Sequence, residues 1–537
     1  MTRALSRAAV VAATAAILAA VALPGLAQTT VGPADRDVIW VRVADRSLPE
    51  LLAVPEIAAL AAAGGAAIAP ASTLLGTTVD LGAVGAVLRE RLAATEATDV
   101  LVIVVGVAPP AGDPLLPVVI AEGSPTTILR TEGAPRALTS DSTHREGVVT
   151  AGDVLATANA FWGGGVATTA VGAPVRPTDS PAPLDLHRRF LERSRSLVPV
   201  GGTFAILATL LGSGAILALA LARRGRVPRR VLDALAWTVL AVPALSLVLL
   251  LVGHLPVLTT AVVLPTALAA TALVTWIGGR RGASAAPTVL GAIVLLGFAV
   301  EAATGWRGQL LAFLGASLLD GGRFYGMSNA FIGLLVGAAA FVAWRIPRPR
   351  GVALLLATGA FAGLPMLGSN VGGATTAFAA AGLWWAIGRR GRLDPIALLL
   401  GAAVTIAGIA FVFAAHALWP TPTHVDGAIA EGGGIVGHYV DRLRIGARML
   451  RDHPLSVVPA LGGPILLALA LRPPVGLAAG FADASGSREV VLVLAVSSLV
   501  AYVANDSGAA AAGLTWGLGL VLALWVSLRA ASARMPA

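Results

Sequence analysis

The chain has 537 residues, of which 56% are hydrophobic and only 12% are charged. Soluble globular proteins carry about 25% charged residues, so this composition excludes an ordinary soluble enzyme and places much of the chain in lipid. The chain contains no cysteine, which excludes disulfides, zinc–thiolate sites and a thiol nucleophile.

Charge is distributed unevenly along the chain, and all 38 basic residues are arginines. Residues 31–196 carry 18 acidic residues and 13 arginines, a net charge of −5. The remainder carries 11 acidic residues and 25 arginines, a net charge of +14. Because these arginines lie in short clusters between apolar runs, they indicate membrane topology. We therefore expect membrane lipids as partners and no nucleic acid.

Residues 1–29 predict a signal peptide or an N-terminal membrane anchor. Arg3 and Arg7 precede an apolar run over 8–23, and small residues follow at 25–27. Cleaved and uncleaved forms both remain open. Either form places the residues from about 30 onward outside the cytoplasmic membrane.

Residues 30–185 form the most polar long region and predict an extracytoplasmic α/β domain. Strands are predicted at 37–43, 66–70, 99–107 and 116–122, and helices at 48–63, 81–96 and 150–162. This alternation favours a mainly parallel sheet, with the apolar run 99–107 as its central strand. Residues 186–196 then form an arginine-bearing linker.

Residues 197–537 predict an α-helical polytopic membrane domain of about eleven spans, because its apolar runs approach the ~20 residues that cross a bilayer. The runs cover 197–222, 231–253, 257–278, 285–305, 326–344, 352–368, 374–388, 395–418, 455–471, 490–504 and 509–528. Arginine clusters lie in every second connection between the runs. This alternation predicts that the C-terminus is cytoplasmic and that loop 419–454 is outside.

With this topology, polar residues from distant connections gather on the outer face. The predicted substrate-binding residues are Arg323, Tyr325, Asn329, Asn370, His438, Arg442, Asn505 and Asp506. We expect Arg323 to bind an anionic head group, and Asn370 and Asp506 to orient that group or accept a proton. Asparagine, glycine and serine also occur in turns for backbone reasons, which is the alternative for each residue taken singly.

Two further features belong to this outer face. Glu301 lies inside an apolar span and is therefore a functional candidate, with Arg307 or Arg323 as partner; a snorkelling side chain is the alternative. The outer loop has helical spacing between arginines, which suits phosphate or pyrophosphate head groups or, alternatively, a surface of acidic phospholipid. These loop arginines are Arg442, Arg444, Arg448 and Arg451.

The external region contains Asp45 after its first strand, the segment PEIAALAAAGGAAIAP, and LTSDSTHREGVVTAGDVLATANAFWG at 138–163. In the last segment Thr143 precedes Arg-Glu-Gly, and Asp153-Val154 opens a helix. On these residues the region resembles a shortened, degenerate member of the alkaline phosphatase/sulfatase superfamily. That resemblance implies two metal sites and a Ser or Thr nucleophile, for which Asp45 and Thr77 or Thr78 are the matching positions.

The segment after the central strand departs from that pattern. It reads Val-Gly-Val-Ala-Pro-Pro over 105–110, where the superfamily brings Asp and His together. Without those ligands two divalent ions cannot be held to activate a nucleophile. We therefore expect a pseudoenzyme with no bound metal and no cofactor.

The membrane domain contains RFYG-x-x-N at 323–329, G-x-N-x-GG at 368–373 and NDSG at 505–508. On these motifs it resembles a family of uncharacterised bacterial multi-pass membrane proteins. The outer loop ends in Arg-Asp-His-Pro-Leu at 451–455, which is similar to the loop of O-antigen-ligase-type proteins.

Together these features favour a protein that handles a lipid-linked or envelope-associated anionic substrate, such as a lipid-linked glycan, by transfer, ligation or transport. A transporter or flippase is the alternative, as is a scaffold whose external domain recruits envelope enzymes. The sequence leaves open whether the protein is an enzyme.

Overall fold

The computed structural model describes two compact units, and each is considered by itself. One comprises Met1–Glu192, Ser317–Tyr325 and Trp419–His438; the other comprises Arg193–Ala316, Gly326–Leu418 and Tyr439–Ala537. The described residues are 36–43, 48–63, 65–70, 77–79, 81–106, 115–130, 136–141, 143, 146–149, 151–161, 173–178, 206–252, 267–269, 271–273, 276–277, 285–306, 326–419, 440, 443–444, 447–448, 451, 457–471, 481, 484–505 and 508–535.

The first unit is an α/β domain built on a five-stranded sheet of order β2-β5-β4-β1-β3. Its elements are β1 (Arg36–Val43), α2 (Leu48–Leu52), α3 (Pro55–Ala63), β2 (Gly65–Pro70), β3 (Thr77–Val79), α4 (Leu81–Ala94), β4 (Asp99–Gly106), β5 (Leu115–Gly123), η1 (Ile128–Arg130), β6 (Leu138–Thr139), α5 (Ala151–Phe161) and β7 (Arg176–Pro177). The two short strands β6 and β7 pair with each other in a separate ladder.

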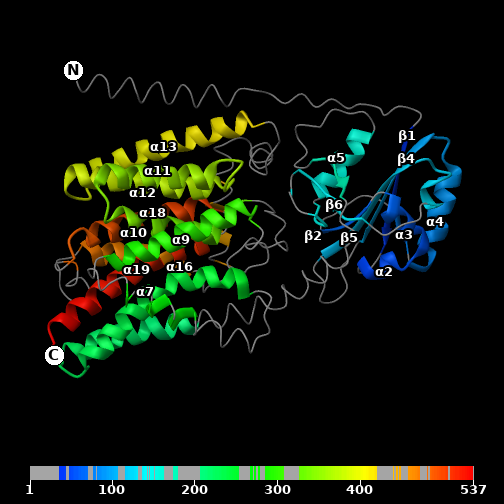
Figure 1. Ribbon diagram of the computed structural model, residues 1–537. Helices are drawn as coiled ribbons and strands as arrows, with labels where there is room; N and C mark the ends of the chain where they lie inside the picture. The colour runs from blue at the N-terminus through cyan, green and yellow to red at the C-terminus, as the bar shows by residue number, and fades with distance from the viewer. Residues whose placement is uncertain are drawn as a thin grey trace, which may run out of the picture. The chain divides into compact units, whose positions relative to one another are not determined.

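The core of this domain lies on both faces of β4, whose residues 100–105 are all buried. On one face α5 contributes Val154, Ala158 and Phe161 to a cluster with Leu101 and other residues of β4 and β5. Helix α3 packs on β5 and α4 packs on β1. Figure 1 shows α5 on one side of the sheet and α3 and α4 on the other. This burial on both faces explains the continuous apolar sequence of β4.

The prediction of a mainly parallel sheet is wrong, because half of the pairings are antiparallel. Strand β1 is parallel to β3 and β4, whereas β5 is antiparallel to both β4 and β2. The physical reason is the connection from Gly106 to Leu115, which is too short for the crossover of a dozen or more residues that a parallel neighbour requires. The predicted helix over 48–63 is also divided, because Pro55 lacks the N–H that would continue it.

The second unit is a bundle of long helices (Figure 1). They are Ile206–Ala222, α7 (Arg229–Val252), α9 (Ala286–Ala303), α10 (Asn329–Ala343), α11 (Arg348–Gly363), α12 (Val371–Arg390), α13 (Pro395–Ala417), α16 (Val457–Leu471), α18 (Ser487–Ala504) and α19 (Gly508–Ala533). These bounds match ten of the predicted apolar runs to within a few residues at most ends. The run 257–278 lies mostly outside the described residues.

Among the described residues, four helices are long and apolar enough to cross a membrane, which indicates a membrane protein. They are α9, α13, α18 and α19. Helices α10, Ile206–Ala222 and the 460–471 part of α16 are apolar but shorter. Helix α13 exposes large apolar side chains such as Leu399, Ile406 and Phe411, as a lipid-facing helix would. The count of eleven spans stays a prediction.

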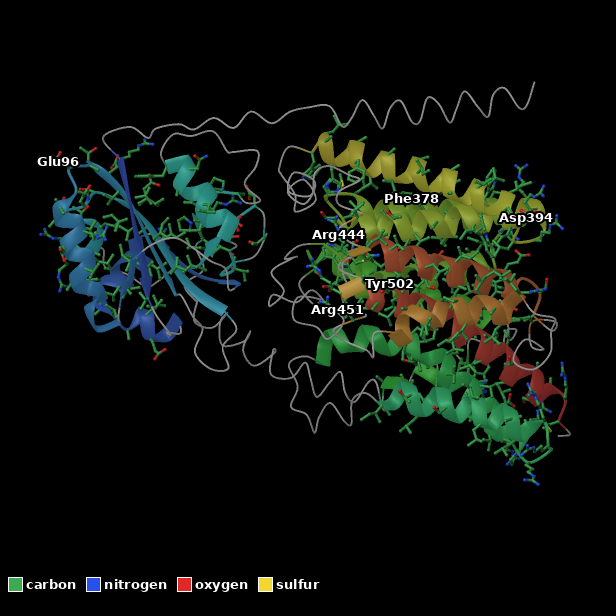
Figure 2. The ribbon with its side chains drawn as sticks, turned by 180° about the vertical axis from the view of Figure 1, so that it is seen from behind. Glu96, Phe378, Asp394, Arg444, Arg451 and Tyr502 are labelled. Carbon is green, nitrogen blue, oxygen red and sulfur yellow. The ribbon has the colours of Figure 1, made fainter. Side chains whose placement is uncertain are left out.

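Helices α10 and α12 form the centre of the bundle. Helix α12 packs against α11, α13 and α18, and α10 packs against α9 and α19. Small residues allow this close packing. The Phe378 ring (Figure 2) lies against Gly359 of α11 and Gly408 of α13, and neither position leaves room for a Cβ atom. Gly333 of α10 lies against the backbone of α19 at Leu514 in the same way.

Neighbouring helices run in opposite directions, so alternate connections lie at the same end of the bundle. The two ends therefore carry different sets of polar residues. We call one the asparagine end, defined by Asn329, Asn370 and Asn505, where α10 and α12 begin and α18 ends. We call the other the arginine end, defined by Arg348, Arg390 and Arg529. Figure 2 shows Asp394 at one end of the bundle and Arg444, Arg451 and Tyr502 at the opposite end. Asp394 pairs with Arg390, so its end is the arginine end.

Candidate functional site

Asn370 connects two of the predicted site segments at the asparagine end. It is fully buried, and its Nδ2 donates hydrogen bonds to the Met327 carbonyl at 2.9 Å and to Asn329 Oδ1 at 3.0 Å. Its Oδ1 accepts the Gly373 N–H at 2.8 Å and so caps α12. Both donor hydrogens of Asn370 are therefore used within the protein, which makes it a residue that positions Asn329 and the start of α12.

The backbones of these two segments also meet directly. The Met327 N–H donates to the Gly368 carbonyl at 2.7 Å, beside Gly326, which has a φ of +81°. A side chain at Gly326 would collide with that carbonyl, so both its conformation and its contact require glycine. The Asn370 N–H donates to the Ala362 carbonyl at 2.8 Å, which fastens the turn to the end of α11. The glycines of the RFYG and G-x-N-x-GG motifs thus serve close backbone packing.

Asn505 brings the third motif against the first turn of α12. It follows the last residue of α18, is 2% exposed, and donates from Nδ2 to the Ala501 carbonyl at 2.8 Å. Its Oδ1 and the Ala504 carbonyl lie so close to Gly372 that a Cβ atom there would strike both. The negative end of α18 therefore meets the positive end of α12, which is a favourable arrangement of helix dipoles.

Glu301 is connected to the same end of the bundle through its own turn. Its side chain is buried in the last turn of α9, and its carbonyl accepts the Trp306 N–H at 2.8 Å. The buried Trp306 indole donates to the Leu367 carbonyl at 2.7 Å, in the turn that precedes Asn370. Glu301 is thus linked through Trp306 to the turn that precedes Asn370 at the asparagine end.

The structure brings together three of the eight predicted substrate-binding residues: Asn329, Asn370 and Asn505. The other five, together with Arg307, lie outside the described residues; they are Arg323, Tyr325, His438, Arg442 and Asp506. In the predicted outer-loop helix, the described residues at 440, 443, 444, 447, 448 and 451 are helical and exposed. Figure 2 shows Arg444 and Arg451 at the end of the bundle where Tyr502 lies.

Sequence reasoning missed an ion-pair cluster at the arginine end. Arg348 of α11 pairs with Glu489 of α18, donates to the Trp384 carbonyl at 2.8 Å, and lies 4.2 Å from the Trp384 ring centroid. Arg529 of α19 pairs with Asp233 of α7 at 2.7 Å. The contacts of Arg348 join α11, α12 and α18, and the contact of Arg529 joins α19 to α7. The arginines at this end therefore also have a structural role. The signal in the sequence was an acidic residue close to arginines, as in Asp233 near Arg230 and Glu489 beside Arg488.

At the arginine end, a titratable residue caps the start of α13. Asp394 caps α13 by accepting the Ala397 N–H at 2.8 Å, and it pairs with Arg390 and Arg392. The hydrogen bond from Arg390 is the largest cause that lowers the pKa of Asp394 to about 2, followed by the bond from Ala397. The carboxylate is therefore charged at all physiological pH values.

In the α/β domain, polar residues of the segment 138–163 form a buried structural network. Asp153 is fully buried; its Oδ2 accepts the Ser140 hydroxyl at 2.8 Å and its Oδ1 accepts the Ala173 N–H at 2.9 Å. The Thr143 hydroxyl donates to the Val148 carbonyl at 2.9 Å. Both carboxylate oxygens of Asp153 are thus occupied in holding α5 to the β6 and β7 region.

Among the described residues, no group of three or more His, Asp or Glu side chains is placed to hold a metal ion. Asp45 lies outside those residues, and Thr77 and Thr78 lie on β3.

Comparison of the chain with protein-family models, curated proteins and solved structures found no match. Function is therefore inferred from the arrangement of the described residues.

Proposed function

We propose that this chain is a multi-pass protein of the cytoplasmic membrane whose asparagine end faces outward and binds a lipid-linked or envelope-associated anionic substrate. The observation that carries the proposal is the convergence of Asn329, Asn370 and Asn505. Each comes from a different connection of the bundle, and Asn370 is hydrogen-bonded to Asn329. Connections at one end of an antiparallel bundle lie near one another in any case; what supports a site is that buried hydrogen bonds from Asn370 fix two of these connections in one arrangement.

The proposal assigns the charge recognition to arginines. Arg323 precedes Gly326 by three residues, and Asp506 directly follows Asn505. Arg323 and Asp506 are therefore close in sequence to the residues of the asparagine end. Arg444, Arg448 and Arg451 add exposed positive charge on the helical segment. Arginine is suited to this task because its planar guanidinium donates two parallel hydrogen bonds to a phosphate.

The opposite end supports the proposed orientation. Arg223, Arg224, Arg345 and Arg350 flank helices at the arginine end, where the positive-inside rule expects the cytoplasm. The asparagine end then faces outward, on the side where the signal or anchor segment would deliver the external domain. We also propose that this domain is a pseudoenzyme that assists binding or recruitment, since Asp153 is committed to internal hydrogen bonds.

The test measures binding of a defined anionic lipid. The full chain is reconstituted in phosphatidylcholine nanodiscs containing a polyprenyl monophosphate, and bound lipid is quantified by native mass spectrometry. We expect Arg323→Ala to weaken retention of the phosphate lipid about tenfold or more, as loss of a charge-assisted hydrogen bond implies. The matched control is Arg392→Ala at the arginine end, which should leave retention unchanged. Equal retention by wild type and Arg323→Ala would refute the proposal.

A further inference from the structure

The connection between the helix Ile206–Ala222 and α7 concentrates exposed positive charge at the arginine end. We call residues 223–230 the arginine turn; its exposed arginines are Arg223, Arg224, Arg226, Arg229 and Arg230. Within the described residues, the carboxylate that pairs with this turn is Asp233, which lies 3.8 Å from Arg229. Asp233 also pairs with Arg529 of α19 at 2.7 Å. The arginine turn therefore keeps a strong net positive charge within the fold.

The backbone of the arginine turn is held in a closed conformation. The Gly225 N–H donates to the Ala222 carbonyl at 3.0 Å, and the Arg226 N–H donates to the Leu221 carbonyl at 3.1 Å. Gly225 has a φ of +66°, which ends the preceding helix, and the Val227 side chain is buried. The arginines are thus gathered on a fixed turn, which lowers the ordering cost of binding an anion.

Helix stability does not account for these arginines. Arg229 and Arg230 form the start of α7, a helix of 24 residues with no acidic residue in its first turn. The N-terminus of a helix carries the positive end of the helix dipole, so cations there are unfavourable. The neighbouring arginines of the turn repel one another as well. An anion bound at the arginine turn would offset both repulsions.

An exposed apolar ridge adjoins the arginine turn. Ile206, Leu210 and Leu217 are 61%, 64% and 59% exposed. At 3.6 residues per turn these three positions fall on one face of their helix and span about 16 Å, close to the roughly 15 Å of hydrocarbon in one leaflet. A lipid has both a charged head group and apolar chains, so it matches the turn and the ridge together. An acidic protein segment would match the turn alone.

We propose that the arginine turn and the ridge of Ile206, Leu210 and Leu217 bind an anionic phospholipid. The guanidinium groups contact the phosphate of the head group, and an acyl chain lies along the ridge. This surface belongs to the end of the bundle opposite the asparagine end. The inference therefore goes beyond the proposed function and stands or falls independently of it.

The experiment reads lipid proximity at one position of the ridge. The chain contains no cysteine, so Leu217→Cys in the full chain can be labelled with bimane and reconstituted in phosphatidylcholine nanodiscs. A rising fraction of the lipid is replaced by phosphatidylglycerol or phosphatidylcholine that carries a doxyl quencher on its acyl chain. We expect half-maximal quenching at a mole fraction of phosphatidylglycerol about fivefold lower or more, since one arginine near an anionic lipid contributes about this factor.

Replacing Arg223, Arg224 and Arg226 together by glutamine should make the two quenchers equally effective. The matched control replaces Arg345, Arg350 and Arg392, three other exposed arginines outside the arginine turn, by glutamine and should keep the preference. Equal quenching by both lipids in the unsubstituted turn would overturn the lipid assignment and favour an acidic protein partner. A preference that persists after the substitutions in the turn, or that is lost equally in the control, would also overturn it.

Discussion

Replacement of Asn370 by alanine tests how strongly the asparagine end is held together. The change removes the cap of α12, which costs about 1 kcal/mol. It also removes the two hydrogen bonds that Nδ2 donates to the Met327 carbonyl and Asn329 Oδ1, at about 1 kcal/mol each for a typical hydrogen bond. Because Asn370 is fully buried, water cannot replace these bonds. We therefore expect a loss of about 3 kcal/mol in the free energy of unfolding.

The assay is equilibrium unfolding of the detergent-solubilised full chain, followed by tryptophan fluorescence. Asn370→Ser keeps a neutral oxygen that can cap α12 but loses both donated hydrogen bonds, so its stability should lie between those of wild type and Asn370→Ala. If the serine variant were as stable as wild type, the link to residues 327 and 329 would contribute nothing. A neutral Asn370→Ala would show that Asn370 does not hold the asparagine end together.

Three further predictions concern the rest of the chain. The pKa of Asp394 is lowered from 3.8 to about 2, so its stabilisation is complete above about pH 4 and is lost as the pH falls through 2; Asp394→Asn should therefore show a shallower loss of stability over this range in acid titrations. Glu489→Gln should reduce stability by about 1 kcal/mol through the Arg348 pair, and a double-mutant cycle with Arg348→Ala that gives strictly additive losses would contradict this pairing. Ser140→Ala should destabilise the α/β domain by about 1–3 kcal/mol by removing the donor to Asp153, with faster hydrogen exchange over residues 136–161; exchange no faster than in the exposed control Ser124→Ala would contradict it.

The helices of the bundle could be predicted because burial in lipid requires continuous apolar runs. Helix α13 was expected over 395–418 and is found over Pro395–Ala417, where Asp394 supplies the cap. The meeting of Asn329 with Asn370 could also be predicted, since every second connection of an antiparallel bundle lies at the same end. Helix α12 begins three residues earlier than its apolar run, because the cap at Asn370 allows Val371, Gly372 and Gly373 to join the helix.

Long-range pairings could not be predicted from one sequence. Arg348 and Glu489 are 141 residues apart, and nothing in their local patterns connects them. The partner of a charged residue depends on which helices are neighbours, which the apolar pattern does not encode. The same limit applies to β5, whose apolar sequence is compatible with either direction; only the short connection that precedes it indicated an antiparallel neighbour.

Single-cysteine labelling tests the outward-facing asparagine end most directly, because the natural chain contains no cysteine. Leu418, which directly follows α13 at the asparagine end, is 85% exposed, and the Arg392 side chain at the arginine end is 73% exposed. In intact cells treated with a membrane-impermeant maleimide, Leu418→Cys should be labelled, whereas Arg392→Cys should react only after the membrane is permeabilised. Labelling of Arg392→Cys alone in intact cells would place the asparagine end in the cytoplasm and would contradict the proposed outward orientation.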